Sequence, residues 1–250
     1  MTSGDHQPNP VAPTGLPDPE FVLRDTDWAS EEMYTSRGYA EGVPALLRAL
    51  LDLDYEVKDR ALGDLEPIRH QSTVYPPAVP AARYIAAILS DPRTAVVGTS
   101  GLAWGWLRKE RPRSFRAELL EWLGSLADDC DDKNRSYSPR PHPYMDEVRA
   151  LRPEFFDAVA PFLHDDDIEV RHAALIAAVP LAEALELAHH RAELAACALR
   201  LLNDPVTDQY HRARALAGLA AWGHEVQEWQ TSADIEAIAE LERYADEPPF

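Results

Sequence analysis

A stretch of tryptophans and cations is the first feature of this sequence that could do chemistry. It comprises Trp104, Trp106, Arg108, Lys109, Arg111, Arg113 and Arg116. Aromatic rings stack on flat groups and guanidinium ions pair with phosphates or carboxylates, so this belt could bind an anion, a nucleic acid or an acidic peptide. Tryptophans on a helix also fill the core between helices, which would leave the cations as a solvated rim. The pattern predicts that the belt ends a helix, and both interpretations stay open.

A second polar segment contains His70, Gln71, Thr73 and Tyr75. These side chains could form a site on a connection that the helices beneath it hold rigid. They could instead satisfy the backbone of that connection, because a buried linker must pair its amides. We favour the structural role and keep His70, Gln71 and Tyr75 among the candidate partner-binding residues.

Two acidic runs have the composition of metal sites but not the spacing. They are His164-Asp165-Asp166-Asp167 and the run from Asp128 to Asp132. Carboxylates in a short turn point in different directions and serve as helix caps. Nucleophilic triads and phosphate-binding loops also lack their usual local context. The sequence therefore assigns no metal, no cofactor and no catalytic residue. It favours a protein without enzymatic activity.

The composition is that of an acidic globular chain. Its 250 residues are 46% apolar and can fill a core, which excludes fibrous and wholly disordered classes. The 43 acidic residues against 24 basic ones give a net charge of −19, which disfavours nucleic acid and favours a basic partner. No apolar run could span a membrane and the first residues lack the features of a signal peptide, so we expect a cytoplasmic protein. Cys130 and Cys197 are expected to be reduced thiols.

Three segments organise the chain. Five prolines in residues 1–19 predict a disordered tail, and residues 246–250 predict a frayed C-terminus. Residues 20–245 carry apolar side chains three and four apart, with no hairpin dipeptide between alternating runs. This pattern predicts a single all-α domain with almost no strand.

A Leu-x-Asp triplet recurs through this domain. Its leucines are Leu50, Leu89, Leu126, Leu163 and Leu202, which are 39, 37, 37 and 39 residues apart. Each leucine closes an apolar helix, and each aspartate stands where a carboxylate can cap the next one. Stacked helical hairpins follow from this period. The predicted apolar helices are Val43–Leu51, Val79–Leu89, Phe115–Leu126, Phe155–Leu163 and Leu194–Leu202.

The repeat that begins at Leu163 resembles a HEAT repeat. Asp165, Val170-Arg171 and Ala174-Leu175 match that family's Asp, Val-Arg and Ala-Leu pattern. Lys58 replaces the arginine in the first repeat, and Val97 replaces it in the second. The resemblance implies an α-α superhelix, or solenoid, of about five HEAT-like hairpins.

The ends and the middle of this solenoid depart from the pattern. The polar, proline-rich segment 128–143 predicts an inserted loop in the third repeat, followed by a shortened helix at Tyr144–Leu151. Insertions in repeat proteins commonly lie on one face, often the binding face. The segment Ser232–Tyr244 predicts a capping helix.

The segment from His70 to Tyr75 carries a second resemblance. It is similar to a His-Gln-Gly-Thr-x-Tyr segment of small actinobacterial HEAT-like proteins, with Ser72 in place of the glycine. Some HEAT-like proteins are encoded beside secreted toxins and are regarded as immunity proteins. The resemblance therefore implies a non-catalytic protein-binding scaffold that neutralises a basic toxin or binds another basic partner.

Two functions of different classes remain open. The basic-partner scaffold predicts that Glu56, Asp59, Glu169 and Asp208 face one continuous surface and that binding weakens with salt. The alternative is a HEAT-like enzyme or ligand-binding protein, similar to DNA glycosylases or specific for an anionic small molecule, that uses the belt 104–116. The candidate partner-binding residues are Glu56, Asp59, His70, Gln71, Tyr75, Trp104, Arg108, Arg111, Arg113, Glu169 and Asp208.

Overall fold

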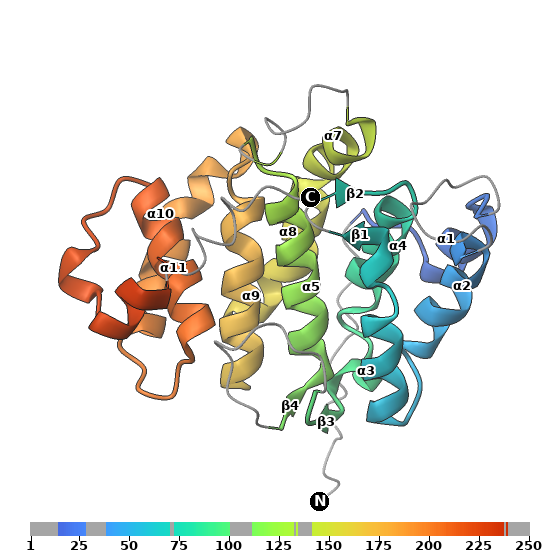
Figure 1. Cartoon of the computed structure of the whole chain (residues 1–250), viewed down its shortest axis with the longest axis horizontal. Helices are drawn as coiled ribbons and strands as arrows, with labels where there is room; N and C mark the ends of the chain where they lie inside the picture. Colours follow the sequence, from blue (N-terminus) through green and yellow to red (C-terminus); the bar gives the residue numbers. More distant parts are fainter. Residues whose placement is uncertain are drawn as a thin grey trace, which may run out of the picture.

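The computed structural model of the chain describes residues 15–28, 39–70, 73–100, 112–132, 134, 142–237 and 239. These residues are mostly helical, as the sequence predicts, and their buried apolar side chains form one continuous core (Figure 1). Residues 1–14 of the predicted tail and residues 241–250 lie outside the described part, and residues 232–237 of the predicted capping segment are helical.

The principal helices form pairs that are consecutive in the chain. The first helices of the pairs are α2 (Tyr39–Ala49), α4 (Ala78–Ile88), α8 (Arg152–Val159) and α10 (Arg191–Leu202). The second helices are α3 (Tyr55–Gly63), α5 (Phe115–Asp129), α9 (Ile168–Leu181) and α11 (Gln209–Ala221). Each second helix packs against the first helix of its pair. The second helices also pack on one another in the order α3, α5, α9, α11, and α2, α4 and α8 do the same, so the pairs build two layers.

Shorter elements lie before, within, between and after these pairs. They are α1 (Pro19–Asp25), α7 (Pro143–Ala150) and the 3-10 turns η1 (Glu66–Ile68), η2 (Pro92–Ala95), η3 (Ala160–His164), η4 (Leu185–His190) and η5 (Gln227–Trp229). The helix α7 matches the shortened helix expected at Tyr144–Leu151. The described strands form two short antiparallel pairs, β1 (Arg69–His70) with β2 (Thr73–Val74) and β3 (Val97–Gly98) with β4 (Arg113–Ser114).

Aspartates organise the turn before most second helices, in a slightly different way from the prediction. The side chain of Asp165 accepts the Asp167 amide at 2.9 Å, and Asp167 in turn accepts the Glu169 amide at 2.9 Å as the N-cap of α9. Asp52 and Asp54 repeat this arrangement before α3. Before α3 and α9, the aspartate of the Leu-x-Asp triplet therefore folds the turn, and the aspartate two residues later caps the helix.

The third Leu-x-Asp triplet does not mark a turn. The helix α5 continues through Leu126 to Asp129, so Asp128 lies inside it and caps nothing. Since α5 packs on α4 and on the second helices α3 and α9, it is the second helix of the α4 pair rather than the first helix of another. Residues 89–114, which include the β3–β4 pair, separate α4 from α5, so that Leu126 near the end of α5 lies 37 residues after Leu89, the length of one period. The described helices thus form four such pairs where the sequence predicted about five hairpins.

The close contact between α5 and α9 depends on a glycine. A Cβ atom on Gly124 would lie 2.6 Å from the Cα atom of Ala177, well inside van der Waals contact. A larger residue at position 124 would force the two helices apart. This contact fixes how near the side chains on the first turns of α5 and α9 come to one another.

Candidate functional site

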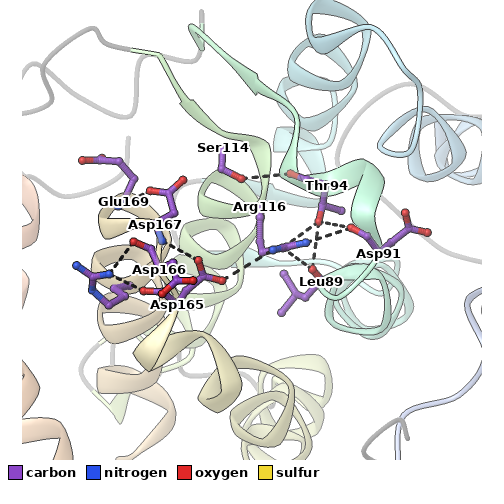
Figure 2. Close-up of polar contacts among 10 residues, drawn as sticks. Leu89, Asp91, Thr94, Ser114, Arg116, Asp165, Asp166, Asp167 and Glu169 are labelled. Carbon is purple, nitrogen blue, oxygen red and sulfur yellow. Dashed lines mark hydrogen bonds and ion pairs between the residues drawn. The ribbon is translucent and has the colours of Figure 1, made fainter. Parts of the chain in front are cut away.

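Arg116, at the start of α5, joins two neighbouring turns of the structure. Its guanidinium donates to the carbonyl of Leu89 at 2.7 Å and to the hydroxyl of Thr94 at 3.1 Å, both in the turn after α4. It also lies 3.9 Å from the carboxylate of Asp165, in the turn before α9. Figure 2 shows Arg116 between these two turns, with Asp91 and Thr94 on one side and the aspartates of the next turn on the other. We call this arrangement the Arg116 joint.

Cations on the other second helices also donate to turn carbonyls. Arg171 of α9 donates to the carbonyls of Asp165 and Asp166, and Arg212 of α11 donates to the carbonyl of Leu202 at 2.6 Å. Lys58 of α3 donates to the carbonyl of Arg93 in the following turn. The expectation that Val97 takes the arginine position of the second pair is wrong, because Val97 belongs to β3. Arg116, the second residue of α5, donates to the turn after α4 instead.

Arg113, three residues before Arg116, is the centre of a buried ionic cluster instead. It lies on β4 and is only 5% exposed, so it is neither at the end of a helix nor on a solvated rim. Its Nη2 atom is 2.5 Å from Glu121 Oε1, and its Nε atom is 3.4 Å from Glu118 and 3.9 Å from Glu169. Glu118 and Glu121 come from α5 and Glu169 from α9, so one arginine gathers three carboxylates from two helices.

The cluster continues from α5 to α11 through histidine. His211 is fully buried, and its Nε2 atom lies 2.8 Å from Glu121 Oε1 while its Nδ1 atom lies 3.3 Å from Asp208, the N-cap of α11. The His172 ring of α9 lies 5.9 Å from the His211 ring. We call Arg113, Glu118, Glu121, Glu169, His172, Asp208 and His211 the Arg113 cluster.

Burial separates the proton affinities of the two glutamates on α5. Burial and the neighbouring Glu121 carboxylate raise the pKa of Glu118 to about 8. Burial acts in the same direction on Glu121, but the ion pairs with Arg113 and His211 outweigh it and lower the Glu121 pKa. Near neutral pH, Glu118 therefore favours the protonated form and Glu121 the charged form.

Two neutral groups lie beside these charges. Burial and the nearby His211 lower the pKa of His172 to about 4, so His172 is uncharged at neutral pH. Burial and the carboxylate of Glu118 raise the pKa of Tyr55, whose ring packs on Phe115 at 5.9 Å. Within the described residues, the Tyr55 hydroxyl and His172 Nδ1 have no hydrogen-bond partner. Tyr55 and His172 therefore each place a polar atom without a described hydrogen-bond partner beside this ion network, which is buried where β4, α5, α9 and α11 meet.

The structure separates the carboxylates that were expected on one surface. Glu56 is exposed and Asp59 is half-buried, with its carboxylate accepting the Ser100 hydroxyl at 2.5 Å. Glu169 and Asp208 are buried in the Arg113 cluster, so these four residues do not face one continuous surface. The periodic pattern places all four near the start of second helices, but it does not distinguish an exposed position from one that packs against a neighbouring helix.

The remaining candidate residues are described only in part. Tyr75 is half-buried, and its amide donates to the carbonyl of Ile68 at 3.0 Å beside the β1–β2 pair. This contact agrees with the structural role favoured for the segment. Gln71, Trp104, Arg108 and Arg111 lie outside the described residues, as does the side chain of His70.

A pocket lies beside the Arg113 cluster, between α5, α9 and α11. Its volume is about 190 Å³, and Gly124 and Asp128 of α5 lie on one side of it, with Tyr210 and Arg214 of α11 on another. Arg214 Nη2 is 2.7 Å from Asp128 Oδ2, and the Arg214 guanidinium lies 5.7 Å from the centre of the Tyr210 ring. We call this cavity the α5–α9–α11 pocket. The remaining lining residues are Ile176, Val179, Pro180, Glu183, Ala217, Gly218, Ala221 and Trp222.

Sequence reasoning missed most of the cluster and the pocket. A signal was present, because Glu118 and Glu121 interrupt the apolar run Leu119-Leu120 and Trp122-Leu123, and His172 and His211 interrupt alanine-rich helices. Charged residues on the buried face of a helix need partners. Which partners they have depends on the packing of α5, α9 and α11, which no local pattern specifies.

Comparisons with known proteins do not assign the chain to a family. Protein-family models, curated proteins and solved structures yield no match to it. Within the described ranges, no helix is long and apolar enough to cross a lipid bilayer, and no group of three or more histidine, cysteine or carboxylate side chains is arranged to hold a metal ion.

Proposed function

We propose that the chain is a HEAT-like α-solenoid that binds a basic protein partner without catalysis, as an immunity-type protein would bind a basic toxin. The order of helix packing supports the solenoid, because second helices contact second helices along the chain. The aspartate-capped turns and the cations at Lys58, Arg171 and Arg212 support its HEAT-like character, since they recur at corresponding places.

The pairing of Arg113 and Arg116 carries the functional part of the proposal. Arg113 is enclosed by Glu118, Glu121 and Glu169, and Arg116 is held by the turn after α4. Both described cations of the belt are therefore engaged inside the protein, while the chain as a whole keeps a net charge of −19. An acidic surface of this kind attracts basic partners over long range.

The same pairing weighs against the alternative of an anionic ligand on the belt. A site for a phosphate or a nucleic acid needs cations that can leave their internal partners at low cost. Removing Arg113 would break its buried ion pairs with Glu121 and Glu169, which is strongly unfavourable. Neither Arg113 nor Arg116 is available for such a ligand.

Capture from a lysate of the source organism, at low and at high salt, tests the proposal. The N-terminal ends of α3, α5 and α9 share one edge, because Arg116 bridges two turns there and Lys58 bridges a third. Glu56 and Asp166 are exposed on this edge. We expect wild-type protein to capture a basic protein at low salt and release it at high salt, and Glu56→Lys combined with Asp166→Lys to lose most of this capture.

The control for that experiment changes the same charge elsewhere. Asp157 on α8 and Glu186 on η4 are also exposed, and Asp157→Lys with Glu186→Lys should leave capture largely intact. Circular dichroism must show that both double variants are folded. The proposal is wrong if wild type retains no basic protein, or if both double variants lose capture equally.

A further inference from the structure

The α5–α9–α11 pocket has the shape and charge to hold one side chain of a partner. In Figure 1 its three helices lie next to one another, with α9 between α5 and α11. Ile176, Val179 and Pro180 from α9 form an apolar side, and Ala217 and Ala221 on α11 are small, exposed residues of the lining. The cavity of about 190 Å³ equals the volume of about six water molecules in the liquid. That is close to the seven heavy atoms of an arginine side chain.

The carboxylates of this pocket are accessible, whereas one of their two cations is not. The side chains of Asp128 and Glu183 are 35% and 46% exposed. The side chain of Arg152, which donates to Glu183 at 3.0 Å, is only 4% exposed. A carboxylate has about four acceptor positions, so Asp128 and Glu183 can each accept further hydrogen bonds. An anion could reach only Arg214, which already lies 2.7 Å from Asp128.

The local charge around Glu183 favours an incoming cation. Burial, together with the negative charges of Asp131 and Asp128, raises the pKa of Glu183 in spite of its ion pair with Arg152. The carboxylates of Asp128 and Asp131 therefore add to the negative charge of Glu183 at this end of the pocket. A guanidinium there would neutralise it, and the apolar side would cover the three methylene groups of the stem.

We propose that the α5–α9–α11 pocket binds a single arginine side chain of the basic partner, with Asp128 and Glu183 as acceptors and Trp222 and Tyr210 as aromatic neighbours. This inference rests on the proposed function, because it names the group of the partner that the scaffold recognises. Arginine fits better than lysine, since its flat guanidinium can bond two carboxylates and also stack on an aromatic ring.

Titration with N-acetyl-arginine amide tests the pocket without any partner. The isosteric N-acetyl-citrulline amide lacks the charge and serves as the matched ligand. Binding is followed by NMR through the Trp222 indole N–H signal, assigned by its disappearance in Trp222→Phe. We expect a dissociation constant in the millimolar range for the arginine amide at low salt and at least fivefold weaker binding of the citrulline amide. Equal shifts with both ligands, or no shift of the Trp222 signal, would overturn the inference.

Two pairs of variants locate the binding. Ala217→Leu fills the pocket and should abolish the titration, whereas Ala220→Leu, on the same helix but outside the lining, should leave it unchanged. Asp128→Asn and Glu183→Gln should each weaken binding two- to fivefold, as expected for partly exposed ion pairs, and Asp157→Asn should not. Binding that survives in Ala217→Leu with wild-type strength would contradict the assignment to this pocket.

The capture experiment separates the failure of this inference from that of the proposed function. If Ala217→Leu captures the basic protein as well as wild type, while Glu56→Lys with Asp166→Lys does not, the scaffold function stands and the pocket is not its recognition site. If wild type captures no basic protein, the proposed function fails whatever the amide titration gives. If the arginine amide still binds in that case, the pocket is an arginine site for a different partner.

Discussion

Arg113 and Arg116 stand three residues apart and occupy opposite environments. Arg116 is held mainly by neutral oxygen atoms, the carbonyl of Leu89 and the hydroxyl of Thr94, and its side chain is 14% exposed. Arg113 is 5% exposed and held by the carboxylates of Glu118, Glu121 and Glu169. Burial lowers the pKa of Arg116, whereas for Arg113 the effect of burial is outweighed by Glu121 and Glu118, which raise the pKa.

This difference distinguishes the repeated framework of the protein, to which Arg116 belongs, from a single special site around Arg113. Cations that donate to turn carbonyls recur at Lys58, Arg171 and Arg212, so the Arg116 joint belongs to the repeated construction of the protein. The gathering of three carboxylates around Arg113 has no counterpart at those positions. A cluster that interrupts a repeated framework with costly buried charge is where a specific role is expected.

The largest effect should come from removing the centre of the cluster. Arg113→Ala leaves Glu118, Glu121 and Glu169 buried without their shared cation, and we expect about 3–5 kcal/mol loss of unfolding free energy. Urea unfolding at pH 7, followed by far-UV circular dichroism, measures it. Adding Glu121→Gln to Arg113→Ala should recover part of the loss, because it removes one of the buried negative charges. A loss below about 1 kcal/mol would show that the carboxylates are satisfied without Arg113.

Breaking the Arg116 joint should cost less. Arg116→Ala removes hydrogen bonds to the Leu89 carbonyl and the Thr94 hydroxyl but leaves no buried carboxylate, so we expect about 1–3 kcal/mol. The same urea experiment applies, with Arg93→Ala as the control, since Arg93 is exposed and its side chain pairs with Asp91 in the same turn. The comparison between the two regions breaks down if Arg116→Ala destabilises the protein more than Arg113→Ala.

The spacing of α5 and α9 affects both regions together. Gly124→Ala places a methyl group 2.6 Å from the Ala177 Cα atom, and overpacking of this kind costs about 1–3 kcal/mol. Gly42→Ala is the matched control, because nothing lies within 4 Å of its added Cβ atom and alanine favours a helix by about 0.5–1 kcal/mol. Thermal unfolding should therefore show opposite shifts for the two variants. A neutral Gly124→Ala would mean that the helices separate freely.

The pH dependence of stability sharpens the comparison most. The pKa of Glu118 is raised in the folded state, so its contribution is fully present below its unfolded pKa of about 4.5 and is lost as pH rises towards about 8. Glu118→Gln should remove this loss. The unfolding midpoint of the variant should therefore rise relative to that of wild type as pH increases from 5 to 8. Midpoints measured across that range check the result, and a parallel pH profile in the variant would contradict it.

His172, in the same cluster, changes the stability with pH in the opposite direction. Its pKa is lowered to about 4, so its contribution is present above the unfolded value near 6.5 and is lost as pH falls through about 4. His172→Phe should therefore flatten the acid limb of the stability profile. Glu118→Gln serves as the control, since it should change the profile with the opposite sign and up to about pH 8. An unchanged acid limb in His172→Phe would show that His172 is not buried as a neutral ring.

Much of the helical construction could be predicted from the chain. The apolar runs beginning at Val79, Phe115 and Leu194 coincide with α4, α5 and α10, because spacings of three and four identify a helix without knowledge of its neighbours. The role of each helix could not be predicted in the same way. The triplet at Leu126 has the right spacing but lies inside α5, because the long connection 89–114 between α4 and α5 places Leu126 one period after Leu89.

The sequence by itself determined the all-α class, the aspartate turns and the surplus of negative charge, since these follow from residue type and short-range spacing. Only the tertiary structure decided that Arg113 is enclosed while Glu56 is exposed, and that Asp128, Glu183 and Arg214 border one pocket. The physical reason is that burial and charge pairing arise between α5, α9 and α11. The side chains that compensate one another there are as much as 90 residues apart in the chain, as Glu121 and His211 are.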